Sequence, residues 1–102
     1  MILIIGSLTK EKNDGFNKAK KHLLDTEKYH QIYGDKDIVT LPELRDTFHY
    51  LDDKQFMDIM YHLLSYLDTI YAIKSWEIDT DARLLHDYAG SNGYKIIYSK
   101  KF

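Results

Sequence analysis

Short apolar runs alternate with amphipathic stretches along this chain. Apolar residues dominate Met1–Ile5, Asp68–Ile73 and Lys95–Tyr98, a pattern typical of strands that are covered on both faces of a sheet. Tyr29–Thr40 also favours β structure, but Gly34-Asp35-Lys36 interrupts it. That segment is read either as one strand with a long approach or as a small hairpin.

Three stretches place apolar residues at spacings of three and four, the period of an amphipathic helix. They predict helices over about Asn13–Asp25, from Asp52 or Asp53 to about Tyr66, and over about Asp81–Ser91. Asp79 or Thr80 is placed to cap the last helix, and Gly93 is placed to end it.

The only proline lies in Leu41-Pro42-Glu43-Leu44 and should end the second strand, because proline cannot continue a central ladder. Arg45–Asp52 is expected to be a loop. The resulting order is β-α-β-α-β-α-β. With right-handed crossovers, it predicts a single three-layer αβα domain over residues 1–102, built on a small Rossmann- or flavodoxin-like parallel sheet of about four or five strands.

The net charge and the amino-acid composition limit the kinds of binding partner and cellular location that the chain fits. A formal net charge of -2 without a basic stripe argues against nucleic-acid binding. The chain has no cysteine, which excludes disulfides and thiolate metal sites and fits a reducing cytoplasm. Ile2–Ile5 is too short for the apolar core of a signal peptide, and no later run is long enough to span a bilayer. We therefore expect a soluble cytoplasmic domain.

Two loops are candidates for ligand binding. Gly6-Ser7-Leu8-Thr9 joins the first strand to the first helix and offers backbone N–H groups and hydroxyls to an anion or a ribose. The alternative is an ordinary turn with local Ser/Thr hydrogen bonds. Trp76 follows a strand at the carboxyl edge of the sheet, where open α/β sheets bind ligands. Its indole either stacks on a base or covers the end of the sheet.

Other chemistry finds little support in the sequence. The five histidines show no metal-ligand spacing, and no serine lies in a nucleophile-elbow context. Gly6 lacks the companion glycines of a dinucleotide fingerprint or a P-loop. We expect neither a metal nor a cofactor. The histidines are His22, His30, His49, His62 and His86.

Five motifs follow one another along nearly the whole chain. The first two motifs are "ISGPxT", similar to Ile4-Ile5-Gly6-Ser7-Leu8-Thr9, and "FxxA", similar to Phe16-Asn17-Lys18-Ala19. The third is "VxNPAEL", similar to Val39-Thr40-Leu41-Pro42-Glu43-Leu44. The last two are "CDAIYxLPGW", similar to Asp68-Thr69-Ile70-Tyr71 with Trp76, and "GARLEHELA", similar to Ala82–Ala89. On these motifs, the chain resembles the short, often phage-encoded members of the nucleoside 2-deoxyribosyltransferase-like superfamily.

The resemblance also implies that the chain lacks the catalytic carboxylates of that family. In that family a glutamate of the last motif attacks the anomeric carbon of a nucleoside and holds a glycosyl-enzyme intermediate. Its position here is Leu85, a second family carboxylate falls on Met60, and Asp81 replaces a family glycine. Leucine and methionine cannot act as nucleophile, acid or base, so we expect no catalytic residue. Asp79 and Asp81 are the acids that would supply any residual chemistry.

For Leu85, simple core packing is the alternative to a place in the pocket, because Ala82 and Ala89 share its helical face. The expected ligand contacts are phosphate or ribose on Ser7 and Thr9 and phosphate on Arg83, with Trp76 on the base. The full set of expected ligand-binding residues is Gly6, Ser7, Leu8, Thr9, Phe16, Pro42, Trp76, Asp79, Asp81, Arg83 and Leu85.

Loss of carboxylates from the cleft should favour an anionic nucleotide over a neutral nucleoside. We therefore expect a non-catalytic nucleotide-binding protein, acting in the host cytoplasm as a phage anti-defence sponge for a cyclic-nucleotide or ADP-ribose-type immune signal. The first alternative is an active nucleoside deoxyribosyltransferase or nucleotide N-glycosidase. The second is an inhibitor that acts by protein–protein contact through its tyrosine-rich surface.

The resemblance further implies a homo-oligomer with sites near subunit interfaces. Tyr98–Phe102 is then the candidate tail that closes a neighbour's site, and a frayed basic terminus is the alternative.

Overall fold

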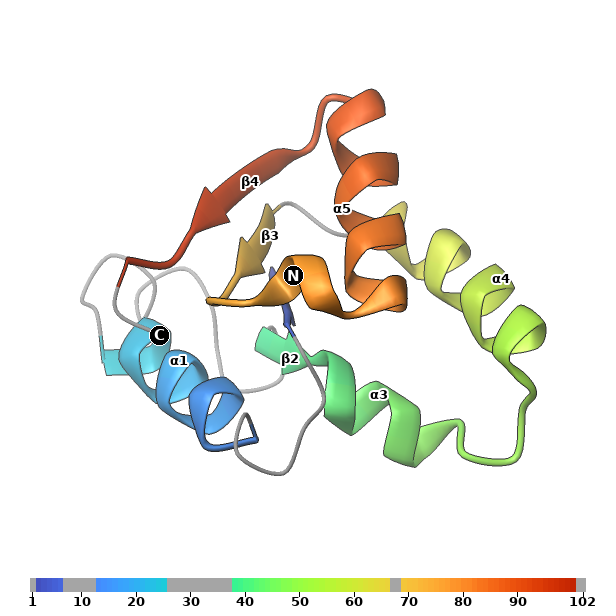
Figure 1. Ribbon diagram of the computed structural model, residues 1–102, viewed down its shortest axis with the longest axis horizontal. Helices are drawn as coiled ribbons and strands as arrows, with labels where there is room; N and C mark the ends of the chain where they lie inside the picture. The colour runs from blue at the N-terminus through green and yellow to red at the C-terminus, as the bar shows by residue number, and fades with distance from the viewer. Residues whose placement is uncertain (1, 7–12, 26–37, 67–68, 101–102) are drawn as a thin grey trace.

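The chain forms a parallel α/β sheet with helices on both faces. The computed structural model describes residues 2–6, 13–25, 38–66 and 69–100 (Figure 1). Four strands lie in the order β2-β1-β3-β4, and every neighbouring pair is parallel. They are β1 (Ile2–Ile5), β2 (Ile38–Thr40), β3 (Thr69–Ala72) and β4 (Lys95–Tyr98).

The two central strands are the most deeply buried part of the molecule. All residues of β1 and β3 are buried, whereas β4, at one edge, has exposed ends and half-buried isoleucines. The register pairs Ile4 with Tyr71 and Ile70 with Ile96. Runs of apolar residues without alternation are what a strand covered on both faces requires. The predicted strands in these places are therefore confirmed.

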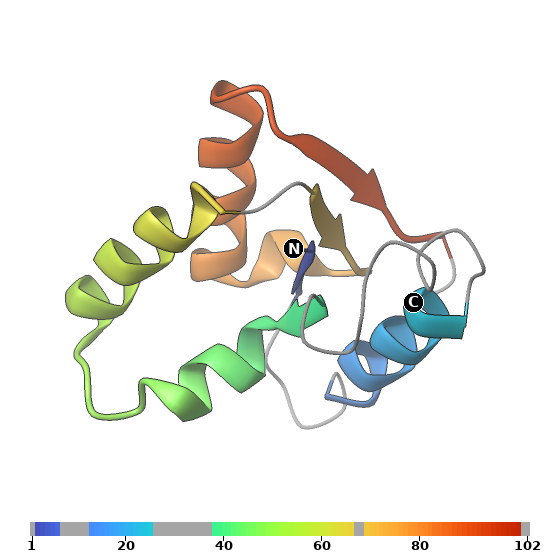
Figure 2. The ribbon, with the colours of Figure 1, turned by 180° about the vertical axis from the view of Figure 1, so that it is seen from behind.

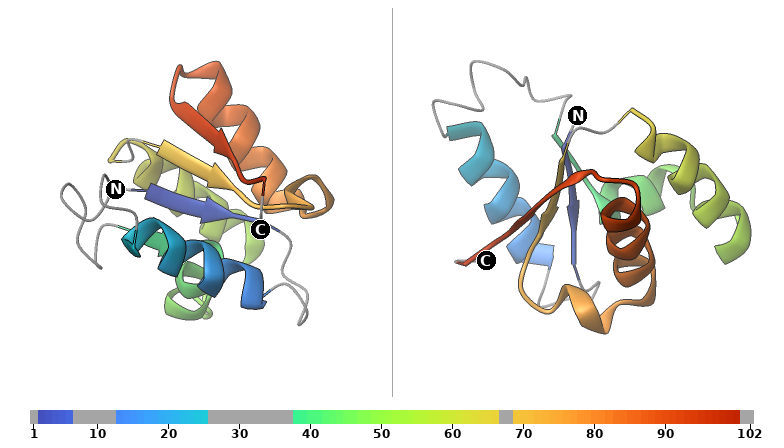
Figure 3. Two further views of the ribbon diagram at one scale, coloured as in Figure 1. Left: turned by 90° about the vertical axis from the view of Figure 1, so that its left-hand side faces the viewer. Right: turned by 90° about the horizontal axis from the view of Figure 1, so that it is seen from above.

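Helices cover both faces of the sheet. α1 (Asn13–Asp25) lies on one face, and α3 (Leu41–Thr47), α4 (Asp53–Leu64) and α5 (Thr80–Ser91) lie on the other (Figure 3). The short 3₁₀ helix η3 (Trp76–Ile78) precedes α5 at the edge where β3 ends. α4 packs against α5 on the side away from the sheet, as Figure 2 shows from behind. The predicted three-layer αβα fold is confirmed.

Side-chain caps fix where three of the helices begin. The side chains of Thr40, Asp52 and Asp79 each accept a hydrogen bond from a backbone N–H in the first turn of α3, α4 and α5 respectively. Asp52 also takes part in a full capping box with Gln55. Each such cap stabilises a helix by about 1 kcal/mol. Gly93, just beyond α5, has a positive φ of 75°, which glycine tolerates at a helix end.

The prediction of a loop over Arg45–Asp52 is wrong for Arg45–Thr47, which belongs to α3, whereas Phe48–Asp52 does connect α3 to α4 without regular structure. Pro42 ends β2 as expected, but it sits in the first turn of a helix, where its missing N–H leaves no bond unmade. Two helices, α3 and α4, therefore lie between β2 and β3. Residues 29–37, for which either a strand approach or a hairpin is predicted, lie outside the described residues.

The core lies between the sheet and its helices. Ala82, Leu85 and Ala89 of α5 are all buried, as their shared helical face predicts.

In the described part of the chain, no helix combines the length and the apolar character that crossing a membrane demands.

Candidate functional site at the carboxyl edge of the sheet

The carboxyl ends of the parallel strands converge on one edge of the sheet. The chain leaves β1 toward β2 on one side, and β3 lies on the other side of β1. Such a reversal of strand order is where open α/β sheets bind ligands. Here the crevice beside β1 is filled by an Ile73 side chain, since a Cβ added at Gly6 would lie 2.4 Å from Ile73 Cγ1 and 3.2 Å from Phe16 Cζ. Only glycine allows this close approach.

An aromatic cluster lies farther along the same sheet edge, beside the end of β4. The Trp76 indole of η3 stacks on the His86 imidazole of α5, with ring centroids 3.9 Å apart and an interplanar angle of 26°. The Tyr98 ring of β4 lies 6.2 Å from the indole and 5.7 Å from the imidazole. Three separate elements thus contribute one ring each.

Hydrogen bonds orient the His86 ring. Its Nδ1 lies 3.1 Å from Asp87 Oδ1, and its Nε2 lies 2.6 Å from the Tyr98 hydroxyl oxygen. An ionised carboxylate only accepts, so Nδ1 carries a proton. In a neutral imidazole Nε2 is then the acceptor, and the Tyr98 hydroxyl donates to it. For a neutral ring, the order of donors and acceptors therefore runs from Tyr98 through His86 to Asp87.

The aromatic cluster borders a hollow of about 270 Å³, which we call the aromatic hollow. Its lining consists of residues 72–77, at the end of β3 and beyond, together with Tyr98 and Ser99. The lining includes Lys74 and also Ser75, whose φ of 68° is left-handed. A left-handed non-glycine residue costs about 1–2 kcal/mol, and residues with such strain cluster at ligand clamps and active sites.

A second group of side chains links α3 to α5. Arg45 Nη2 lies 3.2 Å from Asp79 Oδ2 and 2.5 Å from Asp81 Oδ2. Asp79 also caps α5 by accepting from the Ala82 N–H. Arg45 and Asp81 border a hollow of about 170 Å³, which we call the arginine hollow. Its lining is completed by Asp53 and Phe56 of α4 and by residues of the segment between α3 and α4. One guanidinium faces two carboxylates here, so it carries no spare positive charge for a phosphate.

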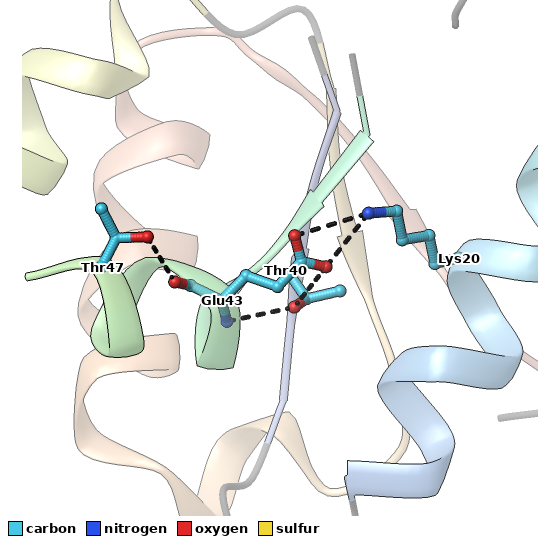
Figure 4. Close-up of polar contacts among 4 residues, drawn as sticks. All are labelled: Lys20, Thr40, Glu43 and Thr47. Carbon is cyan, nitrogen blue, oxygen red and sulfur yellow. Dashed lines mark hydrogen bonds and ion pairs between the residues drawn. The ribbon is translucent and has the colours of Figure 1, made fainter. Parts of the chain in front are cut away.

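A third group lies where β2 ends. Lys20 Nζ of α1 donates to Glu43 Oε1 over 3.1 Å, and the Thr40 hydroxyl donates to the same oxygen, also over 3.1 Å (Figure 4). The Glu43 N–H donates back to the Thr40 hydroxyl. Glu43 borders a hollow of about 200 Å³, the β2 hollow, together with Phe16, Asn17, Thr40, Pro42 and Asp46.

Both positions at which the resemblance expects a carboxylate are buried in the core. Met60 and Leu85 have no exposed surface, and neither lines any of the three hollows named above. Of the two readings of Leu85, core packing is the one that its burial supports. A carboxylate at either position would be buried among apolar side chains.

The structure distributes the other expected ligand-binding residues over three hollows. Trp76 lines the aromatic hollow, Phe16 and Pro42 line the β2 hollow, and Asp81 lines the arginine hollow with Asp79 bonded to the same arginine. Gly6 is buried beside Phe16. Arg83 is exposed and lines none of these three hollows. Ser7, Leu8 and Thr9 lie outside the described residues.

No protein-family model matches the chain, and comparisons with curated proteins and with solved structures also find no match. Membership of the deoxyribosyltransferase-like superfamily therefore stays a prediction from the five motifs. Among the described residues, no group of three or more His, Asp or Glu side chains is arranged to hold a metal ion.

Sequence reasoning missed His86 and Tyr98 as partners of Trp76, and Lys74 as a residue that lines the same hollow. One signal was available. The helix after Trp76 begins only a few residues later, so its first turns must lie near the same sheet edge, and His86 is the aromatic residue there. Arg45 was missed because its segment was read as a loop, while its partners are 34 and 36 residues away in the sequence.

Proposed function

We propose that this chain is a non-catalytic nucleotide-binding protein that holds a nucleobase in the aromatic hollow. The single observation that carries the proposal is the position of the Trp76 indole, backed by His86 and lining a hollow at the carboxyl edge of a parallel sheet. Stacking of a base on an aromatic side chain contributes about 1–3 kcal/mol. Lys74 in the same lining supplies a cation for a phosphate group.

The size of the hollow limits what one chain can enclose. Ligand pockets usually measure about 300–1,000 Å³, and the aromatic hollow holds about 270 Å³. It suits a base with part of its sugar, so the remaining sugar and phosphates of a larger messenger would extend along the sheet edge. A homo-oligomer that places a second subunit against this edge would enclose the rest, which is consistent with the expectation of sites near subunit interfaces.

We expect no cleavage of the bound nucleotide, because apolar residues occupy the positions at which the family has its catalytic carboxylates. Leu85 and Met60 offer no nucleophile or proton-transfer group, and both are fully buried. Among the residues that the structure describes, Glu77 is the only carboxylate in the lining of the aromatic hollow, whereas the retaining mechanism uses two, about 5–5.5 Å apart. A bound nucleotide should therefore leave intact. Together with the phage character of the resemblance, this supports sequestration of a cyclic-nucleotide or ADP-ribose-type immune signal.

The first test uses the only tryptophan as a reporter. Trp76 fluorescence is titrated with AMP, cyclic AMP and ADP-ribose, and calorimetry gives the affinities. We expect saturable quenching by at least one of them and intact ligand on chromatography afterwards. Trp76→Ala should weaken binding about tenfold or more. Tyr50→Ala, at a tyrosine that is 70% exposed and outside the hollow, should leave it unchanged. A folded protein that gives neither heat nor quenching with any of the three contradicts the proposal.

The second candidate is an active nucleoside deoxyribosyltransferase or nucleotide N-glycosidase. The observation in its favour is that Asp81 borders the arginine hollow at the sheet edge with Asp79 close by. Release of free base from nucleosides or nucleotides, lost in Asp79→Asn or Asp81→Asn, would support the enzyme and exclude the binding protein. In this structure both carboxylates are engaged by Arg45, which argues against a role as nucleophile.

A further inference from the structure

We infer that two copies of this chain associate through β4, whose outer side pairs with the same strand of a second copy in antiparallel orientation. β4 forms one border of the sheet, as Figure 1 shows. No strand that the structure describes pairs with the outer side of β4. The inference goes beyond the proposed function, because it concerns a contact between protein chains and is tested without a nucleotide.

The backbone of β4 leaves alternate N–H and C=O groups pointing outward. The Ser99 N–H donates to the Ala72 carbonyl of β3 over 2.8 Å. Successive residues of a strand direct these groups to opposite sides, so Ile97 also bonds inward, whereas Ile96 and Tyr98 direct theirs away from the sheet. A border strand with such a row of outward groups is a template for pairing with another chain.

β4 is better suited to this pairing than the strand at the opposite border of the sheet. β2 has only three residues, and Pro42 follows in the first turn of α3. Native proteins protect the borders of sheets with short strands, proline, bulges or charged side chains. β4 has four residues and no proline, and Lys95 is its only charged residue. Pairing through β4 is therefore less hindered than pairing through β2.

One register satisfies all of the outward groups within β4. With a two-fold axis at Ile97, Ile96 lies opposite Tyr98 of the second copy, and each of these pairs exchanges both of its N–H···O bonds. Shifting the axis to Ile96 would require Tyr94, whose N–H already donates to the Ala89 carbonyl. The two-fold axis also closes the assembly at two copies.

The side chains of β4 complement one another in the same register. Ile96 and Tyr98 both face α5, and the pairing places each beside the other of the second copy, a favourable pair of a β-branched and an aromatic residue. On the opposite face, the half-buried Ile97 meets its own copy. Lys95 lies opposite Ser99, so no lysine faces a lysine. This self-complementarity is the reason to assign the outer side of β4 to a second copy of the chain.

The pairing also extends the wall of the aromatic hollow, and only this consequence rests on the proposed function. Tyr98 and Ser99 line that hollow, and in the inferred register Ile96 and Lys95 of the second copy lie opposite them. The hollow of about 270 Å³ thus gains residues of the second copy along one side. A nucleotide that extends beyond the hollow should therefore favour the dimer by mass action.

The first test uses the absence of cysteine from the chain. Ile97→Cys places two thiols across the two-fold axis, in a non-hydrogen-bonded pair whose Cα atoms lie about 4.5 Å apart, a separation that a disulfide can span. Mild oxidation with copper phenanthroline should convert most of this variant to a covalent dimer. Tyr50→Cys, at a 70% exposed position between α3 and α4, should stay largely monomeric under the same conditions.

The second test measures dimerisation of the full chain by sedimentation velocity over a range of concentrations. Ile96→Pro and Ile96→Val leave side chains of similar size, but only proline lacks the outward N–H. Proline is tolerated in a border strand when its N–H side faces solvent, so both variants should fold, as circular dichroism will check. We expect Ile96→Val to dimerise like the wild type and Ile96→Pro to raise the dissociation constant at least about tenfold.

Three results would overturn the inference. One is a wild type that stays monomeric at every concentration, which would leave the outer side of β4 to an extended segment of another protein. The second is equal cross-linking of the two cysteine variants. The third is undiminished dimerisation of Ile96→Pro, because another surface then holds the dimer. Should Ile96→Pro fail to fold, the comparison of Ile97→Cys with Tyr50→Cys decides. The proposed function fails separately, if the nucleotide titrations of Trp76 show no binding.

Discussion

The backbone of Gly6 lies against the side chain of Ile73, so closely that a methyl group at Gly6 would come within 2.4 Å of Ile73 Cγ1. The two residues follow β1 and β3, the central pair of the sheet. Ile73 is itself bonded to β1, since its N–H donates to the Ile5 carbonyl over 3.0 Å. The crevice at the strand reversal is therefore filled from within, and the aromatic hollow lies to one side of it.

The first prediction follows from this contact. Gly6→Ala should destabilise the fold by about 1–3 kcal/mol, because overpacking a dense core forces its neighbours to shift. Ile73→Ala removes both atoms that a Gly6 Cβ would strike and should cost about 2–5 kcal/mol alone. The double variant should cost less than the sum of the two, as measured by urea unfolding. Strict additivity would show that the contact is not the cause.

A second prediction concerns the link between α3 and α5. Arg45→Met keeps the aliphatic stem but leaves Asp79 and Asp81 side by side without a cation. We expect a loss of about 1–3 kcal/mol in the free energy of unfolding, because two partly buried carboxylates then lack their partner. Arg83→Met, at an exposed arginine on the same helix, is the matched control and should change stability by no more than about 0.5 kcal/mol. Equal effects of the two changes would mean that the link contributes nothing.

A third prediction tests the family nucleophile position directly. Leu85→Glu restores the residue that the resemblance places there, yet Leu85 is fully buried, so the charge would enter an apolar core. We expect severe destabilisation or failure to fold rather than a gain of glycosidic activity. Leu84→Glu, one residue earlier and 42% exposed, should fold normally and serves as the control. A stable Leu85→Glu protein that releases free base would show that this position faces a pocket.

Much of the fold follows from the spacing of apolar residues alone. That spacing predicts Asn13–Asp25 and Lys95–Tyr98 with the bounds that the structure has, because a buried face imposes its period directly on the sequence. It fails at Arg45–Thr47. There, the rule that proline ends a strand does not predict that a helix begins directly after β2. The feature that starts this helix is the side-chain cap of Thr40.

The site was less predictable, because it depends on contacts between distant segments. Trp76 can be placed at the sheet edge from the order of strand, loop and helix. Its partners cannot, since His86 and Tyr98 meet only when α5 has a definite rotation and β4 pairs with β3 in one register. Likewise, a motif can align Leu85 with a catalytic glutamate, but only the packing of α5 decides whether that side chain faces the core.

The last prediction compares two threonines that bond the same residue. Thr40 is 2% exposed, caps α3 and donates to the Glu43 carboxylate, whereas Thr47 only donates its hydroxyl to the Glu43 carbonyl at the solvent-facing end of the helix (Figure 4). Thr40→Val keeps the volume but removes the cap and leaves the Glu43 N–H and carboxylate without that partner. It should cost about 1–2 kcal/mol.

Thr47→Val removes one hydroxyl of the same kind at an exposed position, and its effect should stay within about 0.5 kcal/mol. Both values come from urea unfolding of the full chain, with helix content followed by circular dichroism. If the Thr40 cap anchors the start of α3, the same change also loosens the Arg45 link at the far end of this short helix, so Thr40→Val and Arg45→Met should not be additive. Additive losses, or equal losses for the two threonines, would mean that α3 is held by its packing and not by its cap.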